Sequence, residues 1–226
     1  MTLETSKYLG GIGAILMLLG IFSLGVPYIS ILGLVGLILI MVALHGLGRY
    51  YNENGIFSNA VYGLVIGIIG SVVTAIIAVF VVLSNLTSLE NFLVQIYPGW
   101  TRGDWRALSG MRPTIPSNLD WSPLTSIIAG LLAAFVIGVV FAVISAFFFR
   151  RSLKLLSVKS TIGLFSTAGL LLLIGAALLI AVVIPGAIVI WIAILLLAIA
   201  FFQMQPLQSP TMPTMTTAPM QPPKPT

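Results

Sequence analysis

The sequence of 226 residues contains no cysteine and very few charged side chains. Without cysteine, the chain cannot form disulfide bonds, thiolate metal sites or a redox centre at sulfur. Charged residues make up 7% of the chain, whereas about a quarter is usual in soluble proteins. Its one histidine, His45, cannot by itself supply the several ligands of a metal site. We therefore expect no metal and no cofactor.

Hydrophobic residues, in contrast, make up 59% of the chain, and the mean hydropathy is +1.16. Because one crossing of a bilayer takes about 20 apolar residues in a helix, we predict an all-α, polytopic integral membrane helical bundle with six transmembrane helices. The predicted helices cover residues 8–24, 31–47, 56–83, 123–149, 161–183 and 187–202. They divide the chain into helices one to three at 1–84, a polar segment at 85–122, helices four to six at 123–202 and a tail at 203–226.

Short breaks separate the predicted helices within each group. Gly25 and Pro27 predict a tight reversal over residues 23–30, and basic residues predict a short connection over 150–159. Pro185 with the glycine after it predicts the last reversal, because proline interrupts a helix. If Pro185 instead kinks one long helix, the chain crosses the membrane five times and its C-terminus changes sides.

The polar segment 85–122 holds three of the four tryptophans. Residues 87–90 match a capping box, and apolar residues at helical spacing then predict a short amphipathic helix that ends before Pro98. The remainder predicts an irregular, external Trp-rich cap between helices three and four, with aromatic rings at headgroup depth. Its polar and aromatic residues could form a recognition surface, or they could be an ordinary solvated face. These residues are Trp100, Asp104, Trp105, Arg106 and Trp121.

The distribution of basic residues predicts the orientation of the chain. With the N-terminus in the cytoplasm, the inner side carries Lys7, Arg49, Arg150, Arg151, Lys154, Lys159 and Lys224, and the outer side carries Arg102, Arg106 and Arg112. The positive-inside rule favours this arrangement, with both termini cytoplasmic in the cell membrane. Basic residues scattered in this way act as orientation signals, so we expect no nucleic-acid partner. The proline-rich composition of residues 203–226 predicts a disordered cytoplasmic tail.

Small residues recur at steps of four in the third and fourth predicted helices. Such stripes let two helices approach closely inside a bilayer. We expect the two stripes to face each other or to face partner copies, although glycines at this spacing could also line a translocation path. The stripes are Gly63, Gly67, Ser71 and Ala75 in the third helix, and Gly130, Ala134, Gly138 and Ala142 in the fourth.

The interior of the predicted helices contains no Asp, Glu, Lys or Arg. Ion-coupled transporters and proton pumps usually hold charged side chains near the middle of the membrane. The absence of charged residues here argues against both classes of protein. His45, near the inner end of the second helix, is a possible intramembrane polar residue; it could relay protons, but a packed or interfacial imidazole is the simpler interpretation. The hairpins of helices one and two and of helices five and six resemble each other weakly, as in a parallel repeat.

Three ordered stretches also resemble a known family. Residues 7–16, 31–39 and 56–60 are similar to a mostly archaeal family of polytopic membrane proteins that is catalogued only as a domain of unknown function. The similarity lies mainly in the first three predicted helices. It implies an integral membrane protein of an archaeal cell and supplies no catalytic residue.

Two functions fit these observations. The first is a non-enzymatic scaffold or accessory subunit of a membrane complex, since the uncharged helices carry small-residue stripes suited to packing. Its partners would be the lipid bilayer and either further copies of the chain or other membrane subunits. The alternative is a channel or transporter for a small or weakly polar solute, suggested by the weak repeat and the glycine-containing helices. We expect no enzymatic activity, because no nucleophile and base or set of metal ligands is evident.

Overall fold

The computed structural model describes residues 2–21 and 27–205, with side chains described outside 21–30. The described residues form seven α-helices and one 3₁₀-helix. The elements are α1 (Leu3–Ile21), α2 (Pro27–Tyr50), α3 (Asn54–Ser84), α4 (Leu86–Ile96), η1 (Ala107–Gly110), α5 (Ser122–Ser160), α6 (Gly163–Ala181) and α7 (Val183–Phe202). The all-helical fold class is confirmed.

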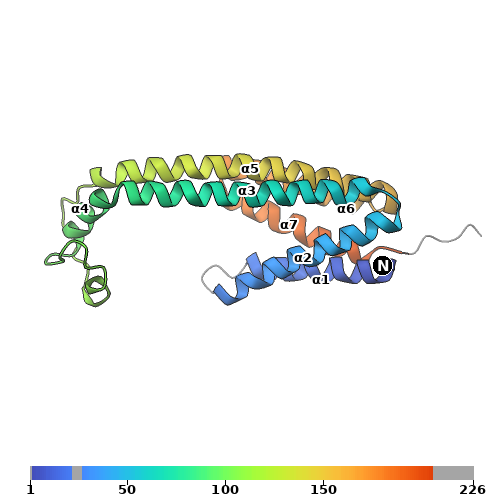
Figure 1. The fold of residues 1–226 in the computed structure, drawn as a ribbon, viewed down its shortest axis with the longest axis horizontal. Helices are drawn as coiled ribbons and strands as arrows, with labels where there is room; N and C mark the ends of the chain where they lie inside the picture. The colour runs from blue at the N-terminus through green and yellow to red at the C-terminus, as the bar shows by residue number, and fades with distance from the viewer. Residues whose placement is uncertain (1, 22–26, 206–226) are drawn as a thin grey trace, which may run out of the picture.

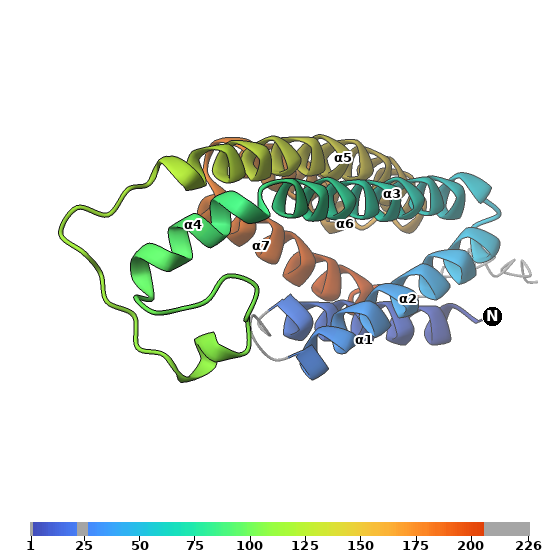
Figure 2. The ribbon, with the colours of Figure 1, turned by 60° about the vertical axis from the view of Figure 1, so that its left-hand side comes forward.

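The antiparallel pair of α3 and α5 forms the spine of the molecule (Figure 1). At a rise of about 1.5 Å per residue, α3 extends ~46 Å and α5 ~58 Å. α6 packs along α5, and α7 connects this layer to the hairpin of α1 and α2. Figures 1 and 2 show the α1–α2 hairpin below one end of the spine, while α4 and the chain that follows it bend to the same side at the other end. The spine is therefore covered unevenly along its length.

The hydrophobic core lies at one end of the spine, where α1, α2, α6 and α7 pack together against α3 and α5. Phe165 of α6 and Phe201 of α7 are fully buried there, with ring centroids 5.2 Å apart in an edge-to-face arrangement. Phe201 also packs against Gly10 of α1, where an added Cβ would lie 2.5 Å from its ring. Met204, just after α7, is buried in the same core. The chain therefore remains packed one residue beyond the predicted start of the tail at 203; residues 206–226 lie outside the described part.

Glycine lets the backbones of both helical hairpins touch. In the α1–α2 hairpin, a Cβ at Gly13 would lie 2.7 Å from the carbonyl oxygen of Gly36. In the α6–α7 hairpin, a Cβ at Gly186 would lie 2.8 Å from the backbone nitrogen of Leu179 and 3.0 Å from the carbonyl oxygen of Gly175. Backbone atoms cannot move aside as a flexible side chain can, so these contacts determine how closely each hairpin closes.

The predicted connection over residues 150–159 is wrong, because this basic stretch is the last part of α5. Arginine, leucine and lysine are good helix formers, and the stretch contains no glycine or proline. Leu153 and Leu156 are buried in the core, which holds this part of α5 in place. The helix ends at Ser160, and the next residue, Thr161, has a φ of 60° in the left-handed region.

The starts of α1 and α4 also differ from the predictions. α1 begins at Leu3, before the predicted residue 8, and the Thr2 hydroxyl accepts a hydrogen bond from the Thr5 backbone N–H at 3.3 Å. This contact caps the helix and lets its first turns include polar residues. α4 begins at Leu86 after Asn85, with no side-chain capping bond, so the predicted capping box is not formed. The short amphipathic helix itself is present.

The last reversal is formed by Val182, whose extended backbone separates α6 from α7. Pro185 lies in the first turn of α7, where the missing backbone N–H is tolerated, so it does not kink one long helix. Gly186, predicted as a turn residue, serves the close packing of the hairpin instead. The predicted reversal over 23–30 falls partly outside the described residues, and α2 begins at Pro27.

Five helices of the described chain are long and apolar enough to cross a membrane, which is typical of a multi-pass membrane protein. They are α2 from residue 31, α3, α5, α6 and α7. α1 is not among them; its described part ends at residue 21 and includes Glu4 and Lys7 in its first two turns. The remaining apolar part from residue 8 to 21 spans only ~21 Å, less than the roughly 30 Å of a hydrocarbon core.

Substitution of Gly36 by alanine is expected to destabilise the protein. The added Cβ would collide with the carbonyl oxygen of Gly13 and lie 2.6 Å from the backbone nitrogen of Met17. Overpacking against backbone costs about 1–3 kcal/mol. Gly163→Ala is the matched control, because a Cβ there meets nothing within 4 Å. Thermal unfolding in a mild detergent should show a lower midpoint for Gly36→Ala only; equal midpoints would contradict the close contact between α1 and α2.

Candidate functional site

The structure brings the predicted stripe glycines of α3 and α5 into one seam. A Cβ at Gly63 would lie 3.0 Å from the carbonyl oxygen of Ser145, and one at Gly67 3.2 Å from the Ser145 hydroxyl. From the other side, a Cβ at Gly138 would lie 2.8 Å from the Thr74 hydroxyl, and one at Gly130 2.6 Å from Val81. Ala134 is buried along the same helix. The two helices therefore face each other within one chain.

The seam does not follow the four-residue spacing along its whole length. On α3 its contacts run through Gly63, Gly67, Gly70 and Thr74, which alternate steps of four and three residues. The average of these steps is close to the number of residues in one helical turn, so the contacts stay on one side of the helix, as in left-handed helix pairs. Each uniform step of four instead turns about 40° around the helix. Ser71 and Ala75 are therefore rotated out of the seam and are exposed.

Two serines of α5 join the seam by hydrogen bonds that the sequence analysis did not identify. The Ser145 hydroxyl donates to the carbonyl oxygen of Gly63 at 2.7 Å, and the Ser152 hydroxyl donates to that of Ile56 at 2.6 Å. Both side chains are buried. The sequence did contain a signal that could have identified them. The two serines lie seven residues apart on a helix that also carries a stripe of small residues. These bonds fix the register between α3 and α5, because neither partner can slide without leaving a polar group unpaired in an apolar layer.

A hollow of about 580 Å³ lies beside the seam, between α3 and α5 on one side and α6 and α7 on the other. The predicted stripe residues Ser71, Ala75 and Ala142 line it together with Thr74 and Ser145. The Thr74 hydroxyl oxygen is buried and makes no hydrogen bond within the described structure. The lining is otherwise almost entirely apolar, so the hollow suits a small, weakly polar molecule or a lipid chain better than an ion.

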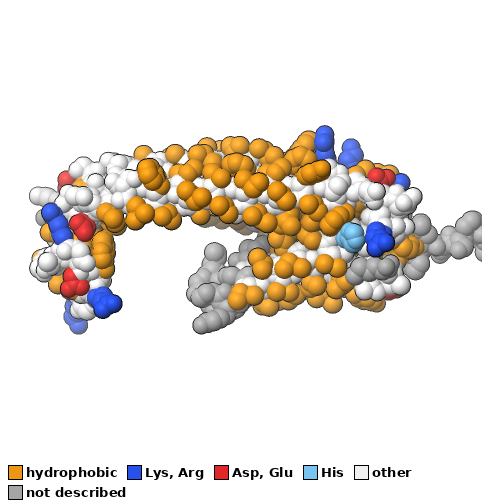
Figure 3. Space-filling model, viewed as in Figure 1, with side chains coloured by type: hydrophobic (Ala, Val, Ile, Leu, Met, Phe, Trp, Pro, Cys, Tyr) orange, Lys and Arg blue, Asp and Glu red, His pale blue; other side chains and the backbone are white. Residues whose placement is uncertain are grey.

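His45 lies on the exposed face of α2, beside a separate apolar groove between α2 and α3. Its ring packs edge-on against Phe57 with centroids 4.6 Å apart, and Arg49 follows one turn later on the same helix. Figure 3 shows the imidazole at the margin of the hydrophobic surface, next to a basic side chain. Within the described chain, no group of three or more His, Cys, Asp or Glu side chains could hold a metal ion. This is the geometry of a packed imidazole near a polar boundary.

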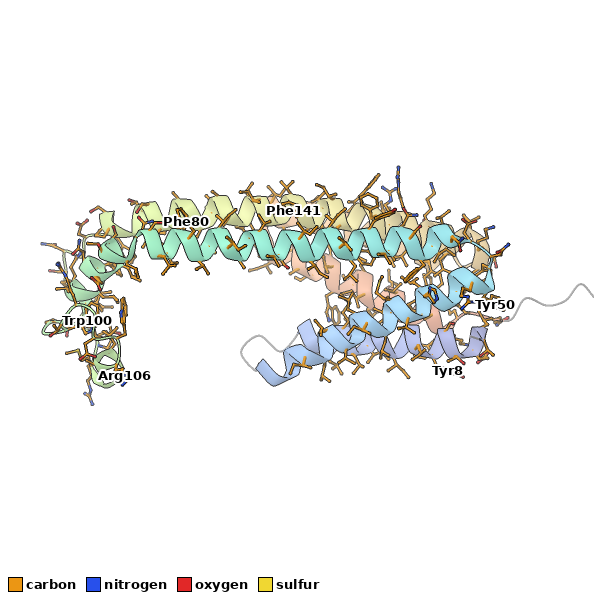
Figure 4. All side chains as sticks on the ribbon, in the orientation of Figure 1. Tyr8, Tyr50, Phe80, Trp100, Arg106 and Phe141 are labelled. Carbon is orange, nitrogen blue, oxygen red and sulfur yellow. The ribbon has the colours of Figure 1, made fainter. Side chains whose placement is uncertain are left out.

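The predicted cap residues form two aromatic contacts at the end of the spine opposite Tyr8 and Tyr50 (Figure 4). Trp100 is 5% exposed, its indole N–H donates to the carbonyl oxygen of Asp104 at 2.7 Å, and its ring lies 5.3 Å from that of Trp105. The Asp104 carboxylate accepts a hydrogen bond from the Ala107 backbone N–H at 3.3 Å. These contacts make a compact turn around Trp100.

The second contact joins Trp121 to Phe92 of α4, with ring centroids 5.5 Å apart. Beside it, the backbone N–H and the hydroxyl of Ser122 both donate to Asp120, and these bonds lower the pKa of the Asp120 carboxyl. Arg106 follows Trp105 in the chain and is exposed. The described contacts therefore join three of the five predicted residues around Trp100 and place Trp121 in a separate contact with Phe92.

The chain matches a known protein family. Residues 32–195 match the model of a family described as a protein of unknown function (DUF996). The match begins after α1 and continues into α7, so it covers much more of the chain than the three stretches in the first half that carry the resemblance in sequence.

A curated relative is equally uncharacterised. Over 105 residues the chain is 38% identical to the uncharacterized protein MJ1644 of Methanocaldococcus jannaschii, an alignment that covers 42% of this chain and 56% of that protein. The chain thus spans little more than half the length of this relative. No solved structure matches the chain.

The contact between α3 and α5 predicts a disulfide in a Thr74→Cys, Gly138→Cys double variant. A Cβ at Gly138 would lie 3.6 Å from Cβ of Thr74, within the range of about 3.5–4.5 Å that disulfides require. The natural chain contributes no competing cysteine. With a protease site inserted after the exposed Gly110, the two fragments should stay joined on a non-reducing gel after oxidation and cleavage.

The matched control is Ala75→Cys with Gly138→Cys, in which the first cysteine moves one residue around α3. That pair should not crosslink, because Ala75 is turned out of the seam. A crosslinked dimer from the Thr74→Cys, Gly138→Cys variant would instead show that the stripes face partner copies.

Proposed function

Since the chain belongs to this archaeal family of unknown function, we propose its role from the faces that its own helices leave uncovered: it acts as a non-enzymatic scaffold or accessory subunit of a membrane complex. The observation that carries this proposal is the unequal length of the helices. α3 and α5 continue past the turn between α6 and α7 toward α4 (Figure 1). Within the described residues, their outer parts therefore pack mainly against each other, with α4 against the start of α5.

The outer parts of α3 and α5 expose large apolar side chains. On α3, Ile76, Phe80 and Leu83 are exposed, and Phe80 is 69% exposed. On α5, Ile128 and Leu132 are exposed along the same length. Lipid can cover such a surface, but a second helical protein gains additional contacts between well-fitted side chains. The surface thus favours association with other copies or with other membrane subunits.

The proposal includes a topology with six crossings, of which α1 is the first. Both termini then lie in the cytoplasm, and the segment between α4 and α5 is an external Trp-rich cap. In support, Figure 3 shows basic side chains at both ends of the spine, but the end opposite α4 carries more of them: Lys7, Arg49, Arg150, Arg151, Lys154 and Lys159, against Arg102, Arg106 and Arg112 between α4 and α5. The positive-inside rule favours such an excess on a cytoplasmic face. The two tryptophan contacts lie at the other end.

Single cysteines in this cysteine-free chain test the topology. Thr101→Cys lies in the exposed cap, and Asn54→Cys lies at the exposed start of α3 near the opposite end. On intact cells, a membrane-impermeant maleimide should label Thr101→Cys, and Asn54→Cys should react only after lysis. The reverse pattern would place the cap in the cytoplasm.

Gentle purification of the tagged protein from its native membrane, followed by mass spectrometry, tests the accessory role. A companion should remain bound in stoichiometric amount and should be lost about tenfold when Phe80 and Leu132 are both replaced by alanine. Ile12→Ala with Ile15→Ala is the control, because these exposed residues lie on α1, away from the outer spine. A wild-type protein that emerges alone as a uniform oligomer would end the accessory interpretation.

The hollow beside the seam favours the alternative of a channel or transporter for a small or weakly polar solute. Its walls offer the hydroxyls of Ser71, Thr74 and Ser145 within an apolar surface. Flux of such a solute into liposomes, reduced when Ala75→Phe fills the hollow, would support this role. Flux that Ala75→Phe leaves unchanged would not run through the hollow.

A further inference from the structure

A second hollow, of about 400 Å³, lies between α3 and α5 at the basic end of the spine. Asn59 of α3 lines it from one side, and Arg151, Lys154, Leu155 and Val158 of α5 line it from the other. It is open at the surface and mixes cationic, amide and apolar groups. It is separate from the hollow beside the seam, with which it shares no lining residue.

Neither cation of this hollow forms an ion pair within the described part of the chain. Arg151 and Lys154 lie three residues apart on α5, where side chains at this spacing share one face, and both are exposed. The ion pair found in the described chain joins Lys159 to Glu53 at 3.3 Å, so it neutralises neither of them. The Arg151 guanidinium instead packs over the ring of Phe147, 4.6 Å from its centroid. The hollow is therefore positively charged and attracts an anion.

The position of the hollow along the spine indicates which kind of anion it binds. In α5, residues 123–149 carry no charge, and the basic residues begin directly after them. Figure 3 shows the basic side chains where the hydrophobic surface of the spine ends. Exposed Phe147 and Tyr62 lie next to the hollow on the apolar side, one turn from Arg151 and Asn59. An anion with long apolar chains would place its charge in the hollow and its chains along these rings.

The hydrogen bonding of Asn59 adds a preference for a headgroup with a hydroxyl. Its Nδ2 donates to the carbonyl oxygen of Gly55 at 2.6 Å, which fixes the amide. No described group donates to its Oδ1, and Asn59 lines the hollow together with the two cations. A phosphate bearing only apolar substituents would leave that acceptor without a donor from the ligand.

We propose that this hollow binds the headgroup of an anionic membrane lipid, with its phosphate on Arg151 and Lys154 and a headgroup hydroxyl on Asn59. Arginine suits phosphate because its N–H groups contact two oxygens at once, and lysine adds a point charge. Basic pockets between membrane helices bind anionic lipid headgroups in this way. The site would anchor the basic end of the spine to lipids that carry a phosphoglycerol headgroup.

Native mass spectrometry of the full chain, released from vesicles of phosphatidylglycerol mixed with phosphatidylcholine, tests the proposal. The wild type should retain phosphatidylglycerol, and the Arg151→Gln, Lys154→Gln variant should retain about tenfold less. Arg150→Gln with Lys159→Gln is the matched control, because it removes the same charge from α5 outside the hollow. Equal losses in the two variants, or no preference of the wild type for phosphatidylglycerol, would overturn the site.

Two further arms separate the alternatives. If soluble glycerol phosphate displaces the lipid at similar concentration, the site recognises a free anion and the lipid assignment is wrong.

Wild type should also retain phosphatidylglycerol better than phosphatidylmethanol, which has the same charge but no headgroup hydroxyl, and Asn59→Leu should abolish that difference. A difference that persists in Asn59→Leu would remove Asn59 from the site. Unchanged unfolding midpoints show that each variant is folded.

Discussion

Close contact between helix backbones at glycine is the constraint on which this structure depends. The contact of Gly13 with Gly36 closes the first hairpin, and that of Gly175 with Gly186 closes the last one. In a bilayer, the hydrophobic effect does not drive helices together, because lipid tails are as apolar as the side chains they would replace. Association then depends on van der Waals contact at short range, which a side chain at any of these positions would prevent.

The seam between α3 and α5 combines such contacts with hydrogen bonds from Ser145 and Ser152. Dispersion forces hold the two helices together without selecting one register, whereas each hydroxyl pairs with one particular carbonyl oxygen. The long spine is thus fixed in register at its basic half, where the other helices also pack. Within the described chain, α6 and α7 do not continue along its outer half (Figure 1), and this difference is the physical basis for assigning it an association surface.

The few charges act at the ends of the spine. Arg151 and Lys154 lie where α5 leaves its uncharged stretch, and Lys159 is paired with Glu53. A charge is costly within hydrocarbon and favourable among headgroups, so these residues limit how far α5 can move along the membrane normal. A bound anionic headgroup between α3 and α5 would strengthen that limit.

The sequence by itself determined the all-helical membrane class, because uncharged apolar runs leave the backbone no other way to satisfy its polar groups in lipid. It also identified Gly63, Gly67, Gly130 and Gly138 as packing positions. Only the tertiary structure decided that Ser71 and Ala75 leave the seam, since the spacing of contacts depends on how two helices cross. The helical conformation of residues 150–159 was likewise decided by Leu153 and Leu156, which are buried by helices distant in sequence. Local patterns describe one helix at a time, whereas packing depends on two.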